Sequence, residues 1–133
     1  MENGTDLAGR RVLLAEDNEL NREVAEALLK ELGLTLDRAE NGKLCLEMFQ
    51  AAAPGYYDAI LMDIRMPVMN GYEAAKAIRA LGRPAAARIP IIAMTADAFA
   101  EDVKRSLDAG MNAHVAKPID VGEVMRLLDK YMK

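Results

Sequence analysis

Short apolar runs alternate along this chain with longer segments of helical periodicity, and this alternation limits the possible folds. The runs that predict strands are 11–15, 34–39, 58–62, 89–94 and 113–116. The segments that predict helices are 19–32, one opening at Asn41-Gly42, about 71–81, 98–109 and 120–132. Strands that alternate with helices form parallel sheets, because each parallel connection needs a crossover. We therefore predict an α/β sandwich with a five-stranded parallel sheet.

Turn residues separate these segments. Gly33, Gly82 and Gly110 follow three of the expected helices, where glycine commonly ends a helix. Asp120 and Glu123 have the spacing of a capping box for the last helix. The alanine-rich segment 84–88, "PAAAR", is predicted to be a loop.

The composition indicates one soluble domain in a reducing compartment. The 133 residues are 52% hydrophobic and 29% charged, and residues 1–9 form a polar tail or linker remnant before a domain at 10–133. A net charge of −4 argues against direct nucleic-acid binding. Cys45 stands alone, which fits the cytoplasm, and we expect it to be a small residue inside a helix and not a reactive thiol. No apolar run approaches the roughly 18 residues of a membrane span.

Chemically active side chains follow four of the predicted strands. Glu16 and Asp17 follow the first strand, Asp63 the third, Thr95 the fourth and Lys117 the fifth. In open parallel sheets, ligands bind at the carboxyl ends of the strands. Separately, these residues are typical of a helix start, a solvated turn, a helix cap and a loop. Their joint occurrence at one edge favours a common site.

Three carboxylates held close together repel one another, and a hard divalent cation would relieve that repulsion. Mg²⁺, or Mn²⁺, takes oxygen ligands and keeps positions open for phosphate oxygens. We expect Asp17 and Asp63 to bind it directly and Glu16 through a water. The backbone carbonyl of Arg65 is a further candidate ligand.

A carboxylate can attack phosphorus to form an acyl phosphate, so Asp63 is the candidate phosphoacceptor. Lys117 would pair with the phosphoryl group, and the Thr95 hydroxyl would donate to it.

The motifs "LLAEDN", "DIRMPVMNG", "MTADAF" and "KPI", in this order, resemble the receiver domain of two-component response regulators. "EDNELNREVA" and "GMNAHVAKPI" are most similar to receivers of hybrid sensor histidine kinases. The resemblance implies a flavodoxin-like, doubly wound (βα)5 three-layer sandwich with strand order 2-1-3-4-5. It also implies that Asp63 is the phosphoacceptor, that Thr95 is the switch hydroxyl, and that Pro118 follows a cis peptide bond.

Two features depart from the commoner pattern of that family. His114 occupies the position of the switch aromatic residue, three residues before Lys117. Arg65 and Asp97 occupy the positions that tune phosphoryl lifetime, and we hypothesise a salt bridge between them that hinders the attacking water.

The resemblance implies a donor that is a histidine kinase domain or a histidine phosphotransfer protein. It also implies an output face, and a possible dimer contact, formed by the helix at 98–109, the strand at 113–116 and the last helix. No membrane contact is expected of this domain, although a parent kinase can be membrane-anchored. We expect a module of a hybrid histidine kinase, with a stand-alone regulator as the alternative. The domain alone would catalyse only its own phosphorylation and dephosphorylation.

Three other functions fit the sequence less well. An aspartyl-phosphate phosphatase of the haloacid dehalogenase type carries its Asp-x-Asp after the first strand, whereas here Asp63 follows the third and Arg65 takes the second-acid position. A flavodoxin-like FMN binder needs a hydroxyl- and glycine-rich phosphate loop after strand 1, but "EDNE" is acidic. A phospho-independent interaction domain would not need the acid pair, acceptor, Thr95 and Lys117 together.

Overall fold

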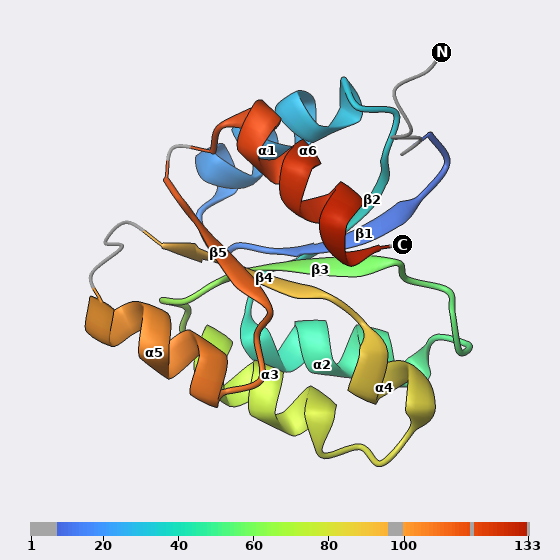
Figure 1. Cartoon of the computed structure of the whole chain (residues 1–133), viewed down its shortest axis with the longest axis vertical. Helices are drawn as coiled ribbons and strands as arrows, with labels where there is room; N and C mark the ends of the chain where they lie inside the picture. Colours follow the sequence, from blue (N-terminus) through green and yellow to red (C-terminus); the bar gives the residue numbers. More distant parts are fainter. Residues whose placement is uncertain (1–7, 96–99, 118, 133) are drawn as a thin grey trace.

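A five-stranded parallel sheet forms the centre of the molecule (Figure 1). The computed structural model describes residues 8–95, 100–117 and 119–132. The strands lie in the order β2-β1-β3-β4-β5, as expected. Their bounds are β1 Arg11–Ala15, β2 Thr35–Ala39, β3 Ala59–Asp63, β4 Ile91–Thr95 and β5 Ala113–Ala116.

Helices cover both faces of the sheet (Figure 1). One face carries α1 (Glu19–Lys30) and α6 (Val121–Tyr131). The other carries α2 (Gly42–Ala51), α3 (Gly71–Arg79), α4 (Pro84–Arg88) and α5 (Ala100–Asp108). The predicted three-layer, doubly wound α/β sandwich is confirmed.

The prediction of a loop at 84–88 was wrong, because these residues form the short helix α4. Pro84 stands in the first turn, where its fixed φ suits a helix and its missing N–H costs nothing. Three alanines follow, and alanine has the highest helix propensity. The backbone N–H of Ile89 donates to Ala85 O at 3.0 Å. Local propensity therefore outweighs the short length of this segment.

Side-chain caps start four helices directly after a strand end or loop. The side chains of Asn18, Asn41, Asn70 and Asp120 accept backbone N–H groups at the starts of α1, α2, α3 and α6. The reciprocal capping box lies at Asn70 and Glu73. It does not form at Asp120, because Glu123 pairs with Arg126 at 2.6 Å instead.

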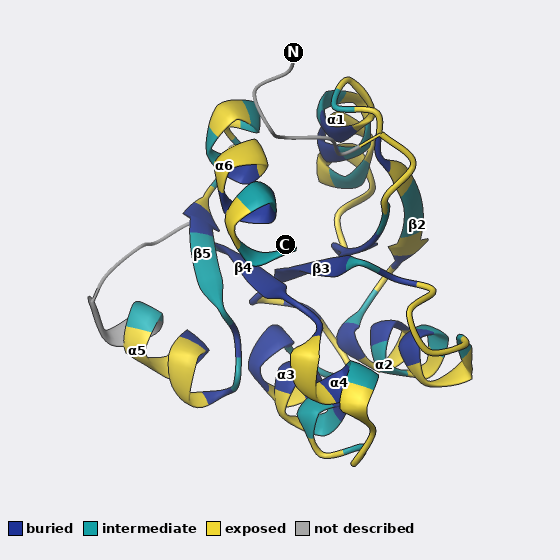
Figure 2. Ribbon diagram, turned by 45° about the vertical axis from the view of Figure 1, so that its right-hand side comes forward, coloured by how far each residue is buried: buried dark blue, intermediate teal, exposed yellow. Residues whose placement is uncertain are grey.

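The sheet separates two apolar clusters, and its central strands are buried on both faces (Figure 2). All five residues of β3 are buried, including Asp63 at its end. Parallel strands between two helical layers are apolar throughout, which is why β3 has the continuous run Ala59–Met62. Cys45 lies in a helix, as predicted, and the structure shows that it is fully buried there. The core thus holds β3 rigidly and brings one acid to the sheet edge.

Candidate functional site

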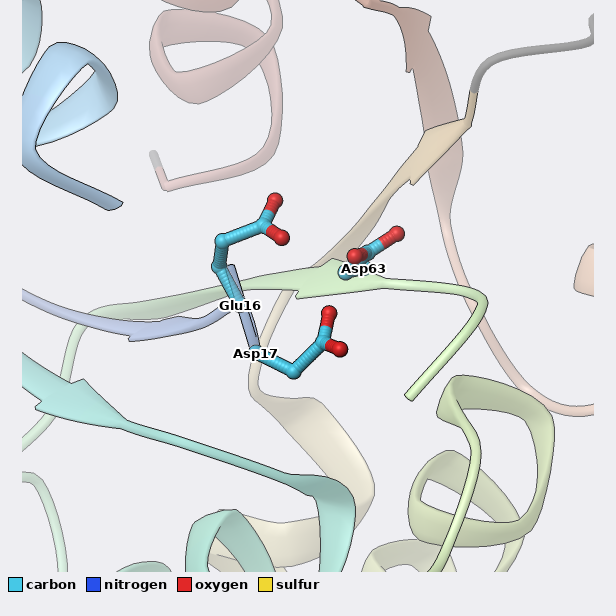
Figure 3. Close-up of side chains that lie close together, drawn as sticks. All are labelled: Glu16, Asp17 and Asp63. Carbon is cyan, nitrogen blue, oxygen red and sulfur yellow. The ribbon is translucent and has the colours of Figure 1, made fainter. Parts of the chain in front are cut away.

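Glu16, Asp17 and Asp63 converge at the carboxyl edge of the sheet (Figure 3). Each offers a carboxylate oxygen, and these oxygens lie within 4.8 Å of one another. Glu16 and Asp17 leave the end of β1 on opposite sides and both turn toward Asp63 (Figure 3). Glu16 and Asp63 are buried, whereas Asp17 is exposed. The structure confirms the prediction that these three acids lie together at one edge of the sheet.

Lys117 reaches the same cluster from the end of β5. Its Nζ lies 2.8 Å from Glu16 Oε1 and 3.0 Å from Asp63 Oδ2. One ammonium group therefore bridges the two buried carboxylates. The bond to Glu16 was not anticipated, because residue order alone does not say which acid a lysine will reach first.

Burial raises the pKa of Asp63 from its ordinary value of 3.8 to about 6. The hydrogen bond from Lys117 opposes this rise, while the neighbouring Glu16 charge adds to it. Burial alone would lower the pKa of Lys117, but its bonds to Glu16 and Asp63 raise it. At neutral pH the site therefore holds an ionised Asp63 beside a protonated Lys117.

These residues line a cleft of about 250 Å³. Its wall also includes Thr95, Asn18 and Asn21. Neither asparagine was predicted as a site residue. The Asn18 backbone N–H donates to Glu16 Oε2 at 3.2 Å, and the Asn18 side chain caps α1. A cap residue directly after an acid pair is the sequence signal that would have indicated this role.

Arg22 is a third unpredicted residue that shapes the site. Its Nη1 donates to the carbonyl oxygens of Glu16 at 2.9 Å and Asp17 at 3.2 Å. Arg22 lies in the first turn of α1, so it ties the helix back to the acid pair. The two acids are thereby fixed between β1 and α1.

The segment from Ile64 to Asn70 leads from Asp63 into α3 and is packed tightly. A Cβ on Gly71 would overlap the carbonyl oxygen of Asp63, and a Cβ on Gly42 would overlap that of Met69. Val68 has φ +69°, a conformation that β-branched residues rarely adopt. Such strain persists only where the surroundings impose it, and it is common beside functional sites.

The remaining predicted residues have mixed outcomes. Arg65 lines the cleft, and its backbone N–H lies 3.4 Å from Asp63 Oδ1. His114 pairs in register with Ala93 on β4, so by strand alternation it leaves the same sheet face as Thr95. Asp97 and Pro118 lie outside the described residues, and so do the predicted salt bridge and cis bond.

The donor set fits a hard divalent cation. Three carboxylates supply only oxygen ligands, which are the ligands that Mg²⁺ prefers. Lys117 approaches Glu16 and Asp63 as a further positive charge. The separations are compatible with one ion held between Asp17 and Asp63.

The chain matches the family model of the response regulator receiver domain over residues 12–129. It is 38% identical to hybrid signal transduction histidine kinase I of Dictyostelium discoideum, covering 88% of this chain but 7% of the kinase. It is 41% identical to two-component response regulator ORR41 of Oryza sativa subsp. japonica, covering 91% of this chain and 93% of that protein. The relatives thus include both long kinases and a regulator of similar length.

Solved structures show the same likeness. The receiver domain of sensor histidine kinase PA1611 from Pseudomonas aeruginosa PAO1, with a magnesium ion in its active-site cleft, is 41% identical. It aligns with a TM-score of 0.83 over 94% of this chain and 98% of that one. The receiver domain of Saccharomyces cerevisiae Ssk1, crystallised with the phosphotransfer protein Ypd1, is 26% identical. It aligns with a TM-score of 0.82 over 94% of this chain and 90% of that one.

None of the described helices is long and apolar enough to cross a membrane. With its strand order and the acids at its sheet edge, this chain belongs to the response regulator receiver domain family of two-component phosphorelays.

Proposed function

We propose that Asp63 accepts a phosphoryl group from a phosphohistidine and that this event switches the conformation of the domain. The position of Asp63 carries the proposal. Asp63 ends a fully buried strand and lies beside two further carboxylates. Its Oδ2 forms an ion pair with Lys117 Nζ at 3.0 Å. A carboxylate held in this way has a fixed direction of attack and needs no base, because it is ionised at neutral pH.

In the proposed transfer, an Asp63 carboxylate oxygen forms a bond to phosphorus while the P–N bond of phosphohistidine breaks. The bonding electrons leave with the imidazole, which departs neutral when its other nitrogen carries a proton. Lys117 holds a phosphoryl oxygen by charge, and the Thr95 hydroxyl donates to another. A bound Mg²⁺ or Mn²⁺ would neutralise charge on the transferred group. Hydrolysis of the acyl phosphate restores Asp63.

We assign the metal to Asp17 and Asp63 as direct ligands, with Glu16 acting through a water and the Arg65 carbonyl as a further ligand. The convergence of the three carboxylates supports this assignment. The magnesium ion in the 41% identical receiver of PA1611 supports the choice of ion.

The phosphohistidine-bearing partner is proposed to dock along α1. A groove of about 380 Å³ beside Glu16 and Lys117 is lined by apolar side chains of α1 and by Ile119. Leu20 and Val24 stand four residues apart on α1 and are 68% and 49% exposed beside it, and exposed apolar side chains grouped in this way mark interaction sites. The Ssk1 receiver bound to Ypd1 supports a histidine phosphotransfer protein or the equivalent kinase domain as the occupant.

Switching is proposed to pass from Thr95 and His114 to the face formed by α5, β5 and α6. The phosphoryl group shifts the equilibrium only through contacts that differ between the two states. A dimer through this face is a further proposal. The same role suits a module of a hybrid kinase, with the domain proper at 10–133, or a stand-alone regulator, since relatives of both kinds occur. In either setting the domain alone acts only on its own phosphoryl group.

Incubation with acetyl phosphate and Mg²⁺, followed by intact mass measurement, tests the proposal. One phosphate adduct is expected on the wild type and on the control Asp108→Asn, whose side chain is 65% exposed on α5. The adduct should be absent from Asp63→Asn. An adduct that persists in Asp63→Asn, or no adduct on the wild type, would overturn the proposal.

The assignment of Arg65 and Asp97 to phosphoryl lifetime has a separate test. The double variant Arg65→Ala, Asp97→Ala should lose its phosphoryl group faster than the wild type, because water reaches the phosphorus more freely. Equal half-lives would rule this role out and leave the acceptor assignment intact.

A further inference from the structure

The acceptor cleft continues into a second hollow that none of the roles above uses. This hollow has a volume of about 440 Å³ and shares Asp17, Ile64 and Arg65 with the cleft. Ile64, Met66 and Tyr72 are buried and give it an apolar floor. A ligand in the hollow would therefore lie next to the cleft that Asp63 lines.

Arg105 closes one side of the hollow, although it is 42 residues from Asp63 in the sequence. Its Cζ lies 4.2 Å from the centre of the Tyr72 ring, in a cation–π contact. Tyr72 is 7% exposed and belongs to the core, so the ring is a fixed support. Stacking uses the face of the guanidinium and leaves its N–H edge available. Arg105 forms no ion pair with any carboxylate among the described residues.

The charges around Asp63 and along the hollow decide which ligands the hollow can attract. Glu16, Asp17 and Asp63 carry three negative charges, and Lys117 offsets one of them. A bound divalent cation would offset the other two, so the acceptor cleft itself offers an incoming anionic phosphodonor no excess of positive charge. Arg65 and Arg105 place two positive charges on the hollow side of the cleft. A rim of this sign raises the local concentration of anions and their rate of arrival.

We propose that Arg105, together with Arg65, forms an anion-capture subsite for small dianionic phosphodonors of the acyl phosphate class. The proposal rests on Asp63 being the phosphoacceptor. In the reaction an Asp63 oxygen bonds to phosphorus, the P–O bond to the acyl group breaks, and its electrons leave with the carboxylate product. No proton moves. Arg105 takes no part in these bond changes and acts by holding the donor, with Tyr72 as its positioning residue.

The test follows the initial rate of phosphorylation by acetyl phosphate with Mg²⁺, at low and at high ionic strength. Arg105→Gln should lower the rate at low ionic strength by about three- to tenfold, and the difference should shrink as salt screens the charge. Arg105→Lys should keep most of the rate. Arg88→Gln is the matched control, because it removes the same charge from an exposed residue of α4 at the opposite edge of the sheet.

Mg²⁺ affinity, measured by calorimetry on the same variants, separates capture from structural damage. Removing a nearby cation should leave Mg²⁺ affinity unchanged or slightly higher. Equal rates for Arg105→Gln and wild type, a loss that salt does not reduce, or weaker Mg²⁺ binding would each overturn the subsite. An absence of any adduct on the wild type would instead overturn the acceptor role of Asp63, so the two failures are distinguishable.

Discussion

The buried charge of Asp63 lowers the stability of the folded state. The residue is 4% exposed at the end of an apolar strand, and burial raises the pKa of its carboxyl to about 6. Lys117 lowers the cost by pairing with it, but the same ammonium is shared with Glu16. A divalent cation bound between these acids would relieve negative charge that the fold leaves uncompensated, so its binding would stabilise the folded state.

Substitution of Asp63 by asparagine should therefore stabilise the metal-free protein. The folded state holds a proton on Asp63 up to a pH of about 6, whereas the unfolded chain releases it near 3.8, so stability falls as pH rises through this interval. At about 1.4 kcal/mol per pH unit, Asp63→Asn should be more stable by about 2–3 kcal/mol above pH 7. The gain should vanish below pH 4. Urea unfolding in EDTA across this range measures it, and a gain independent of pH would contradict the stated cause.

Removal of Lys117 should have the opposite sign. Lys117→Ala leaves Glu16 and Asp63 buried without their shared cation, at a cost of about 3 kcal/mol at pH 7.5. The loss should shrink toward pH 5, as Asp63 takes up a proton. Mg²⁺ should raise the melting temperature of this variant more than that of the wild type. Lys104→Ala, which removes an exposed ion pair with Asp108, serves as the control and should change stability by about 0.5 kcal/mol or less.

The segment between β3 and α3 holds Asp63 by backbone packing. Gly71 lies against the carbonyl oxygen of Asp63, and its N–H donates to Ile64 O at 2.8 Å. Gly42 N–H donates to Met69 O at 3.0 Å, which ties α2 to the same segment. Asp63 is thus held by the backbone contacts of the following segment as well as by the pairing of its strand.

A methyl group at Gly71 should disturb this packing. In Gly71→Ala the new Cβ has no room beside Asp63 O, so the segment must shift, with a loss of about 1–3 kcal/mol. The adduct with acetyl phosphate should form more slowly than in the wild type. Gly122→Ala on α6 is the control, because its Cβ would meet only the Asp120 side chain at 3.3 Å. Unchanged stability and rate in Gly71→Ala would show that the segment tolerates the shift.

Sequence patterns predicted the features that depend on local order. Strand-end acids, Thr95 and Lys117 follow apolar runs, and the parallel topology then brings them to one edge. The helix α4 was missed because its five residues are too short for a periodic pattern. The stacking of Arg105 on Tyr72 and the bond from Lys117 to Glu16 join distant segments. Such contacts depend on side-chain direction in the finished fold, and no spacing in the sequence encodes them.

Two side-chain networks tie distant parts of the molecule together away from the acceptor. At the amino edge of the sheet, Tyr57 donates to Asp37 at 2.8 Å and Arg11 binds the other oxygen of that carboxylate at 3.2 Å. This joins the segment before β3 to β1 and β2. The hydrogen bond adds to the burial of Tyr57 in raising the pKa of its hydroxyl.

The second network is centred on Arg79 at the end of α3. Its guanidinium donates to Gly110 O at 2.9 Å, Ala86 O at 2.8 Å and Asn112 Oδ1 at 3.0 Å. Asn112 Oδ1 also accepts the N–H of Ile91 at 2.8 Å. One side chain thus fastens α3 to α4, to the start of β4 and to the turn between α5 and β5.

Loss of the Arg79 guanidinium should release that turn before it affects the rest of the sheet. Arg79→Met keeps much of the side-chain length but leaves two backbone carbonyls without this donor, for a loss of about 2–3 kcal/mol. Amide hydrogen exchange should become faster in α5 and around Gly110, while β1 and β3 change less, because Ser106 is the only buried side chain among the described residues 103–108 of α5. Arg88→Met, an exposed residue of α4, is the matched control. Exchange that rises by the same factor in every strand and helix would mean that Arg79 supports only global stability and does not fasten this corner.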